Sequence, residues 1–156
     1  PPLNNKQQIF HKYACPYGLG DDIIAIFLID SLKFNNRGDG GASHQRLTGN
    51  FSSCTSWRMV TYVKDATSNV LKMYVNGVLR NTRNLTSGSH NSSVTYRFGA
   101  LRQCTSSNNL VPINFFNGKI DDAGIWDREL TPAEIQNLFD LNFTVDWLYK
   151  VTCNNQ

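Results

Sequence analysis

The sequence predicts an all-β protein: an antiparallel jelly-roll β-sandwich with one short helix near the C-terminus. Apolar, strand-like segments recur at roughly ten-residue spacing, which is typical of sandwiches. The composition is rich in Asn, Ser, Thr and Gly, which favour turns and strand ends, whereas only two Glu are present. The length of 156 residues is that of one domain, so residues 1–156 are interpreted as a single domain.

The expected strands are short apolar segments bounded by polar or glycine-containing loops. In chain order they are residues 8–13, 23–29, 31–35, 57–64, 70–75, 78–80, 94–98, 115–126 and 143–152. The expected loops are residues 15–22, 36–41, 81–93 and 101–112, and a turn is expected over residues 65–69. Gly118 and Gly124 interrupt the long segment 115–126. Between residues 70–75 and 78–80, Asn76-Gly77 predicts a type I′ hairpin turn.

One helix is predicted close to the C-terminus. Thr131 is the expected N-cap, Pro132 occupies the first helical position, and Glu134 follows the cap by three residues, as in a capping box. The apolar face is then formed by Ile135, Leu138 and Phe139. The helix is expected to end near Asp140 or Leu141.

Charge and hydropathy exclude two classes of partner. Charged residues make up 17% of the chain and the net charge is only +3, so we expect no nucleic-acid partner. The longest apolar run, residues 23–29, has the length of a buried strand and is too short to span a bilayer, so we expect no membrane insertion.

Cysteines and glycosylation sequons both favour an extracellular protein. The cysteines are widely spaced, which fits two disulfides better than a zinc or redox site and leaves three connectivities open. They are Cys15, Cys54, Cys104 and Cys153. The alternative is four buried thiols in a cytosolic protein. Asn-x-Ser/Thr sequons begin at Asn50, Asn84, Asn91 and Asn142, of which Asn84 and Asn91 are expected in an exposed loop. We therefore expect a secreted or cell-surface glycoprotein.

Two stretches carry a family resemblance. The first is C-T-S-W at residues 54–57, followed by L-K-M-Y-V-N-G at residues 71–77. The second is F-N-G-K-I-D-D-A-G-I-W-D-R-E-L-T-P-A-E-I at residues 116–135. Together they resemble the laminin-G-like and pentraxin branch of the concanavalin A-like lectin/glucanase superfamily, over about residues 8–152. Ser52 and Met59 stand where the pentraxin signature has His and Ser, so the chain resembles a relative of the pentraxins and not a true pentraxin.

The resemblance also implies strands that this sequence lacks. The sandwich of that family opens with further strands before the position that corresponds to Gln8. Without them a sandwich would expose sheet edges and part of its core. We therefore expect the chain to be part of a longer polypeptide, or another segment to supply these strands.

A calcium site is the first candidate that the resemblance implies. Asp21 and Asp22 stand at the positions of two family ligands, and Asn114 could replace a family amide ligand. Calcium prefers about six to eight oxygen ligands. The loop at residues 101–112, which resembles the acidic half of the family's site, contains no carboxylate. Calcium is therefore possible and no cofactor is required; Asp21 and Asp22 could instead solvate a turn.

The same resemblance suggests how two of the cysteines could be used. Cys15 and Cys104 lie in the two loops that would flank the family's calcium. A Cys15–Cys104 disulfide would join these loops at that place. Cys54 and Cys153 would then pair with each other or with cysteines outside this chain.

The remaining candidate sites are weaker. Arg37-Gly38-Asp39 matches an integrin-type adhesion tripeptide, although its glycine serves a turn equally well. Asp121 and Asp122 are interpreted as structural and not as metal ligands. The histidines, which are His11, His44 and His90, are isolated and are interpreted as surface residues.

Catalysis finds little support, because a glycosidase needs two placed carboxylates. Both glutamates, Glu129 and Glu134, fall in the predicted loop and helix. We therefore expect a non-catalytic extracellular recognition or assembly module, structural or adhesive. Its partners would be other domains or subunits of an extracellular assembly, glycans or cell-surface proteins. The alternative is a calcium-assisted carbohydrate-binding lectin domain, and a glycoside hydrolase relative fits least well.

Overall fold

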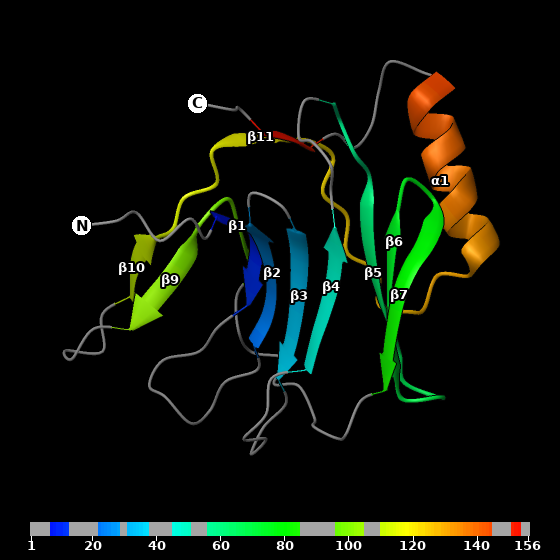
Figure 1. The fold of residues 1–156 in the computed structure, drawn as a ribbon, viewed down its shortest axis with the longest axis horizontal. Helices are drawn as coiled ribbons and strands as arrows, with labels where there is room; N and C mark the ends of the chain where they lie inside the picture. Colours follow the sequence, from blue (N-terminus) through cyan, green and yellow to red (C-terminus); the bar gives the residue numbers. More distant parts are fainter. Residues whose placement is uncertain are drawn as a thin grey trace. The chain divides into compact units, whose positions relative to one another are not determined.

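The computed structural model describes residues 7–12, 22–28, 31–37, 45–50, 56–84, 96–104, 110–144 and 151–153. These residues form antiparallel strands and one helix near the C-terminus, so the predicted all-β class is confirmed (Figure 1). The chain divides into two compact units, which are described separately. Residues 1–50 and 86–116 form the first unit, and residues 51–85 and 117–156 form the second.

The first unit contains a five-stranded antiparallel sheet in the order β4-β3-β2-β1-β8, whose first four strands lie side by side in Figure 1. Its strands are β1 (Gln7–Lys12), β2 (Asp22–Leu28), β3 (Ser31–Arg37), β4 (Gln45–Asn50) and β8 (Tyr96–Phe98). A separate hairpin pairs β9 (Leu101–Cys104) with β10 (Leu110–Ile113). The predicted strands at 8–13, 23–29, 31–35 and 94–98 are therefore confirmed over their described residues. Strands β1 and β2 begin one residue earlier than predicted, and β3 ends two residues later.

Two parts of the first unit differ from prediction. Strand β4 has no counterpart among the predicted strands, because Q-R-L-T-G-N contains one large apolar residue, the buried Leu47. An edge strand needs only one covered position, and the hydrophobic pattern is then too weak to detect. The prediction of a loop throughout 101–112 is wrong, since β9 and β10 lie in it. Pro112 favoured a loop, yet proline is tolerated in a two-stranded ribbon, where both strands are edges.

His11 is buried, so its interpretation as a surface histidine is also wrong. A register shift between Gln8 and Phe10 in the β1–β2 pairing changes the alternation of the strand, and both Gln8 and His11 are buried. Burial, followed by the charge of Arg97, lowers the pKa of His11 to about 4. The imidazole is therefore neutral at physiological pH.

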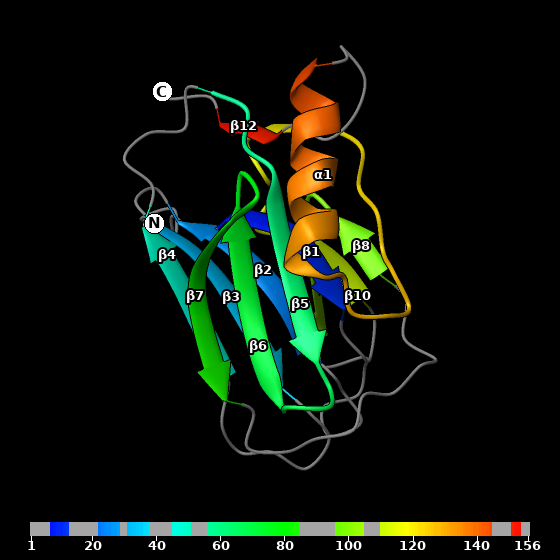
Figure 2. The same cartoon turned by 90° about the vertical axis from the view of Figure 1, so that its right-hand side faces the viewer.

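The second unit contains a three-stranded antiparallel sheet, formed by β5 (Val60–Asp65), β6 (Val70–Val75) and β7 (Val78–Asn84). Helix α1 (Pro132–Thr144) lies alongside this sheet in Figure 2. A two-stranded sheet pairs β11 (Gly118–Ile120) with β12 (Val151–Cys153). The predicted Asn76-Gly77 turn is confirmed: Val75 pairs with Val78, and the φ angles of 51° and 76° are both positive.

Three predicted boundaries in the second unit are wrong. Strand β7 continues to Asn84 where a polar loop was expected, because an edge strand pairs through its backbone and needs no apolar face. Of the expected strand 115–126 only β11 forms, and Asp122 beyond it has a φ of 49°, which a strand does not tolerate. Helix α1 extends to Thr144 because no Gly or Pro stops it at Asp140, so residues 143 and 144 of the strand expected over 143–152 are helical, while residues 151–153 form β12.

The helix packs on the sheet through one apolar cluster. Its buried members are Met59, Val63, Tyr74, Leu130 and Ile135, with Leu138 and Phe139 packed against them. The alternating residues of β6 that do not belong to this cluster, Leu71, Met73 and Val75, are also buried. The central strand therefore carries buried side chains on both of its faces.

Candidate functional site

The polar residues of the second unit gather around the turn after β5. The carboxylate of Asp65 accepts a hydrogen bond from the backbone N–H of Ser68 at 2.8 Å and a second from the Ser68 hydroxyl. Asn69 closes the turn with a φ of 53°. Such an Asx-type turn satisfies a carboxylate locally and fixes its direction. Asp65 is thereby held toward the next strand.

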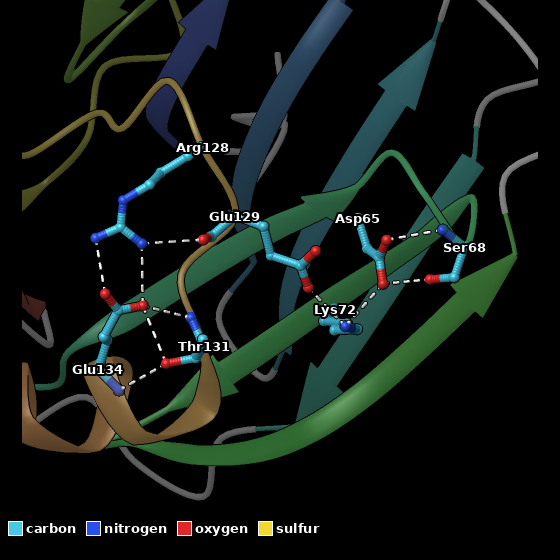
Figure 3. Close-up of polar contacts among 7 residues, drawn as sticks. All are labelled: Asp65, Ser68, Lys72, Arg128, Glu129, Thr131 and Glu134. Carbon is cyan, nitrogen blue, oxygen red and sulfur yellow. Dashed lines mark hydrogen bonds and ion pairs between the residues drawn. The ribbon is translucent and has the colours of Figure 1, made fainter.

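Lys72 on β6 joins this turn to the segment that precedes the helix. Its Nζ lies 3.0 Å from Oδ2 of Asp65 and 2.8 Å from Oε1 of Glu129 (Figure 3). The bond to Glu129 and then the bond to Asp65 raise the pKa of Lys72 above its usual range. Ser68 first, and then Lys72, hold the pKa of Asp65 well below its usual range. Lys72 and Asp65 therefore remain charged and bridged across the neutral pH range.

A second group of contacts surrounds the start of α1. Nη2 of Arg128 donates to Oε1 of Glu134 at 2.7 Å, and Nη1 donates to Oε2 at 3.1 Å. The Thr131 N–H donates to Oε2 of Glu134 at 2.8 Å, while the Glu134 N–H donates to the Thr131 hydroxyl at 3.2 Å. This reciprocal pair is the predicted capping box, which is confirmed. Figure 3 shows that Arg128 extends the box by a two-point ion pair.

The charge of Glu134 makes this cap sensitive to acid. Arg128 first, followed by Thr131, lowers the pKa of Glu134 from 4.5 to about 2. A carboxylate with a depressed folded-state pKa stabilises the fold fully above its unfolded pKa and loses that contribution as pH falls through the folded pKa.

We therefore expect the melting temperature of the wild type to fall towards that of Glu134→Gln as pH decreases from 4.5 to about 2. Glutamine keeps the capping geometry and removes only the charge. Melting curves followed by circular dichroism at stepwise pH measure the difference. Arg128→Ala provides the partner control, because in its background the charge of Glu134 should contribute less. A difference that stays constant over this pH range would contradict the assignment.

These contacts describe a clasp, which we define as Asp65, Lys72, Arg128, Glu129 and Glu134. It connects the segment before α1 with the β5–β6 strands of the same unit. Each carboxylate of the clasp faces a lysine or an arginine. General acid catalysis needs a carboxyl group that keeps its proton near neutral pH, whereas the shifts at Asp65 and Glu134 run in the opposite direction. The clasp is therefore better suited to holding the segment before α1 on the β5–β6 strands than to transferring a proton.

The calcium candidates lie in the first unit. Asn114 has a φ of 52°, and its backbone carbonyl accepts the N–H of Gln8 at 3.1 Å. Asp22 opens β2 and pairs in register with Arg37, while Asp21 lies outside the described residues. Within the described ranges, no group of three or more His, Cys, Asp or Glu is arranged to hold a metal ion. In the second unit, Asp121 accepts the backbone N–H of its neighbour Asp122 at 3.0 Å, a local contact that fits a structural role.

The disulfide, glycan and adhesion candidates are only partly covered by the described residues. Cys104 ends β9 and Cys153 ends β12, whereas Cys15 and Cys54 fall outside, so their pairing stays a prediction. Asn50 ends β4, Asn142 lies in the last turn of α1, and Asn91 is outside. Asn84 is exposed as predicted, but it ends β7 and is not in a loop. Arg37 ends β3, and Gly38 and Asp39 are outside.

Sequence reasoning found part of the clasp and missed the rest. The turn at Asp65 and the capping role of Glu134 were predicted from local spacing. Lys72 and Glu129 were not paired, because they are 57 residues apart and a single sequence carries no signal for a contact at that separation. The spacing of Arg128 and Glu134 across a helix start was a local signal that could have been used.

The part of the chain that the structure describes contains no helix with the length and apolar character needed to cross a membrane.

Comparisons with known proteins place the chain in a family. A laminin-G family model described as "Concanavalin A-like lectin/glucanases superfamily" matches residues 3–136. No curated protein matches the chain. A crystal structure of an S-layer domain-containing protein from Clostridium thermocellum ATCC 27405 is similar, with 21% identity and a TM-score of 0.45. The alignment covers 89% of this chain and 65% of that one, so the chain spans about two thirds of that structure. The family match, which extends over most of the sequence, shows that the chain belongs to the concanavalin A-like lectin/glucanases superfamily.

Proposed function

We propose that the chain is a non-catalytic recognition or assembly module of a secreted or cell-surface glycoprotein. The observation that carries this proposal is the clasp. The chain has only two glutamates, and each of them forms an ion pair with a basic side chain: Glu129 with Lys72, and Glu134 with Arg128. These two ion pairs fasten the segment before α1. A glycoside hydrolase needs two carboxyl groups that face the substrate, one of which donates a proton. The superfamily contains lectins as well as glucanases, and this use of the glutamates favours binding over hydrolysis.

An exposed apolar pair in the same segment supports recognition. Ile125 and Trp126 are 56% and 41% exposed. Tryptophan is enriched among the residues that contribute most to protein interfaces. The clasp would hold this pair in a constant position by anchoring Arg128 and Glu129 immediately after it. The partners we propose are other domains or subunits of an extracellular assembly.

A second candidate function is carbohydrate binding, and an aromatic cluster in the first unit favours it. The rings of Phe10 and Tyr96 are stacked with centroids 5.5 Å apart, and those of Phe10 and Phe98 lie 5.0 Å apart. Tyr96 is 44% exposed and Phe98 is 46% exposed. Exposed ring faces can stack on the apolar face of a sugar, and the Tyr96 hydroxyl could add a hydrogen bond.

Melting experiments with calcium and with a chelator separate the two candidates. For an assembly module we expect the same melting temperature in both. A calcium-assisted lectin with calcium at about 100 times its Kd would instead gain about 2.7 kcal/mol, a rise of several degrees. Asp22→Asn is the matched control, since a rise that disappears in this variant would assign the ion to the predicted site. A calcium-dependent rise, or hydrolysis of a polysaccharide that Glu134→Gln abolishes, would contradict the assembly proposal.

A further inference from the structure

The turn between β6 and β7 carries a chemically reactive dipeptide. Asn76 and Gly77 form its two central residues, and both have left-handed φ angles, 51° and 76°. An Asn-Gly bond is open to intramolecular attack, because glycine has no side chain to hinder its own nitrogen. The deprotonated Gly77 nitrogen bonds to Cγ of Asn76, and the side-chain nitrogen leaves as ammonia. Water then opens the five-membered imide to aspartate or to isoaspartate, with no oxidant or reductant involved.

The folded turn holds Asn76 away from this reaction. A left-handed residue has a ψ of roughly +30 to +50°. In that range Cβ lies on the opposite side of the Cα–C bond from the following nitrogen, so Cγ of Asn76 cannot reach the nitrogen of Gly77. Ring closure therefore requires Asn76 to rotate out of the turn.

Three contacts oppose that rotation. The Asn76 N–H donates to the Met59 carbonyl at 2.9 Å, and Oδ1 of Asn76 accepts the Met59 N–H at 3.1 Å. Gly77 is buried, and the side chain of Gln136 on α1 lies directly against it. The turn is thus held by Met59, which lies just before β5, and by Gln136 of α1, both in its own unit.

We propose that Asn76 is a deamidation site that the folded hairpin protects and that local or global unfolding exposes, with water as the co-reactant. Isoaspartate inserts an additional methylene into the main chain. A two-residue loop that pairs Val75 with Val78 has no room for it, so the modified chain cannot rebuild the hairpin under α1. Unfolding would therefore leave an irreversible covalent change, deamidation, at Asn76.

The test compares the full chain in mildly alkaline buffer with the same chain in concentrated urea. Trypsin isolates Asn76 in the peptide of residues 73–80 after reduction. The same digest isolates Asn117-Gly118, an identical dipeptide, in residues 103–119, which provides an internal reference. In urea we expect both sites to convert at similar rates. In the folded protein, conversion at Asn76 should be slower than in urea by at least about tenfold, because it requires local opening.

A second measurement follows the product. After removal of urea, the folded fraction from size exclusion should contain far less isoaspartate at Asn76 than the aggregated or unfolded fraction. Equal conversion of Asn76 in buffer and in urea would overturn the protection. If the folded fraction contained the same proportion of isoaspartate at Asn76 as the whole sample, the claim that isoaspartate blocks refolding would be overturned.

Discussion

Replacing Ile135 with alanine is expected to lower the free energy of unfolding by about 2–5 kcal/mol. The Ile135 side chain is 0% exposed and lies in the cluster that joins α1 to the β5–β6–β7 sheet. Its removal takes away the transfer free energy of the buried methyl groups and leaves a cavity that the surrounding side chains fill only in part. The backbone N–H of Ile135 donates to the Thr131 carbonyl at 3.0 Å, and alanine keeps this bond. The loss therefore measures packing and not helix formation.

Leu141→Ala is the matched control on the same helix, because Leu141 is 59% exposed. Truncation of an exposed side chain usually changes stability by no more than about 0.5 kcal/mol. Urea unfolding followed by circular dichroism gives both values, and the m-value should stay constant if the unfolded surface is unchanged. Equal effects of the two substitutions would mean that α1 does not dock through Ile135.

The features that the sequence predicted well are the ones that short-range chemistry determines. The Asn76-Gly77 turn and the Thr131–Glu134 box each depend on residues within about four positions of one another, and both are confirmed. The packing of Ile135, Leu138 and Phe139 in the cluster under α1 also follows directly from the helical period of the pattern.

The features that the sequence did not predict depend on contacts between residues far apart in the chain, or on the backbone hydrogen bonds of edge strands. Strand β4 and the end of β7 are edges with polar side chains, and their stability comes from ladder hydrogen bonds that leave no hydrophobic pattern. The burial of His11 results from the shift in the β1–β2 register, and the hydrophobic periodicity of the sequence does not indicate this shift. The Lys72–Glu129 pair forms only after the sheet and the segment before α1 have come together.

Replacing Gly77 with alanine is expected to destabilise the protein more than the same substitution at Gly99. The φ angles are 76° at Gly77 and 77° at Gly99, so both alanines suffer the same left-handed strain of about 1–2 kcal/mol. The surroundings differ. A Cβ at Gly77 would lie 2.5 Å from Oε1 of Gln136, whereas a Cβ at Gly99 would have no atom within 4 Å outside its own residue and the two adjacent ones. The difference between the two variants therefore isolates the contact between the turn and the helix.

The Gln136 side chain can move away from an alanine at position 77. The strength of its hydrogen bond to Asp140 determines how much that movement lowers the stability of the fold. Its Nε2 donates to Oδ1 of Asp140 at 2.9 Å, so a displaced side chain must break or remake a bond that contributes about 0.5–1.5 kcal/mol. We expect Gly77→Ala to exceed Gly99→Ala by an amount in this range, measured by urea unfolding. In a Gln136→Ala background the excess should disappear, because the colliding atoms are gone. An excess that persists in that background would show that the strain arises within the hairpin, and that α1 does not press on the turn.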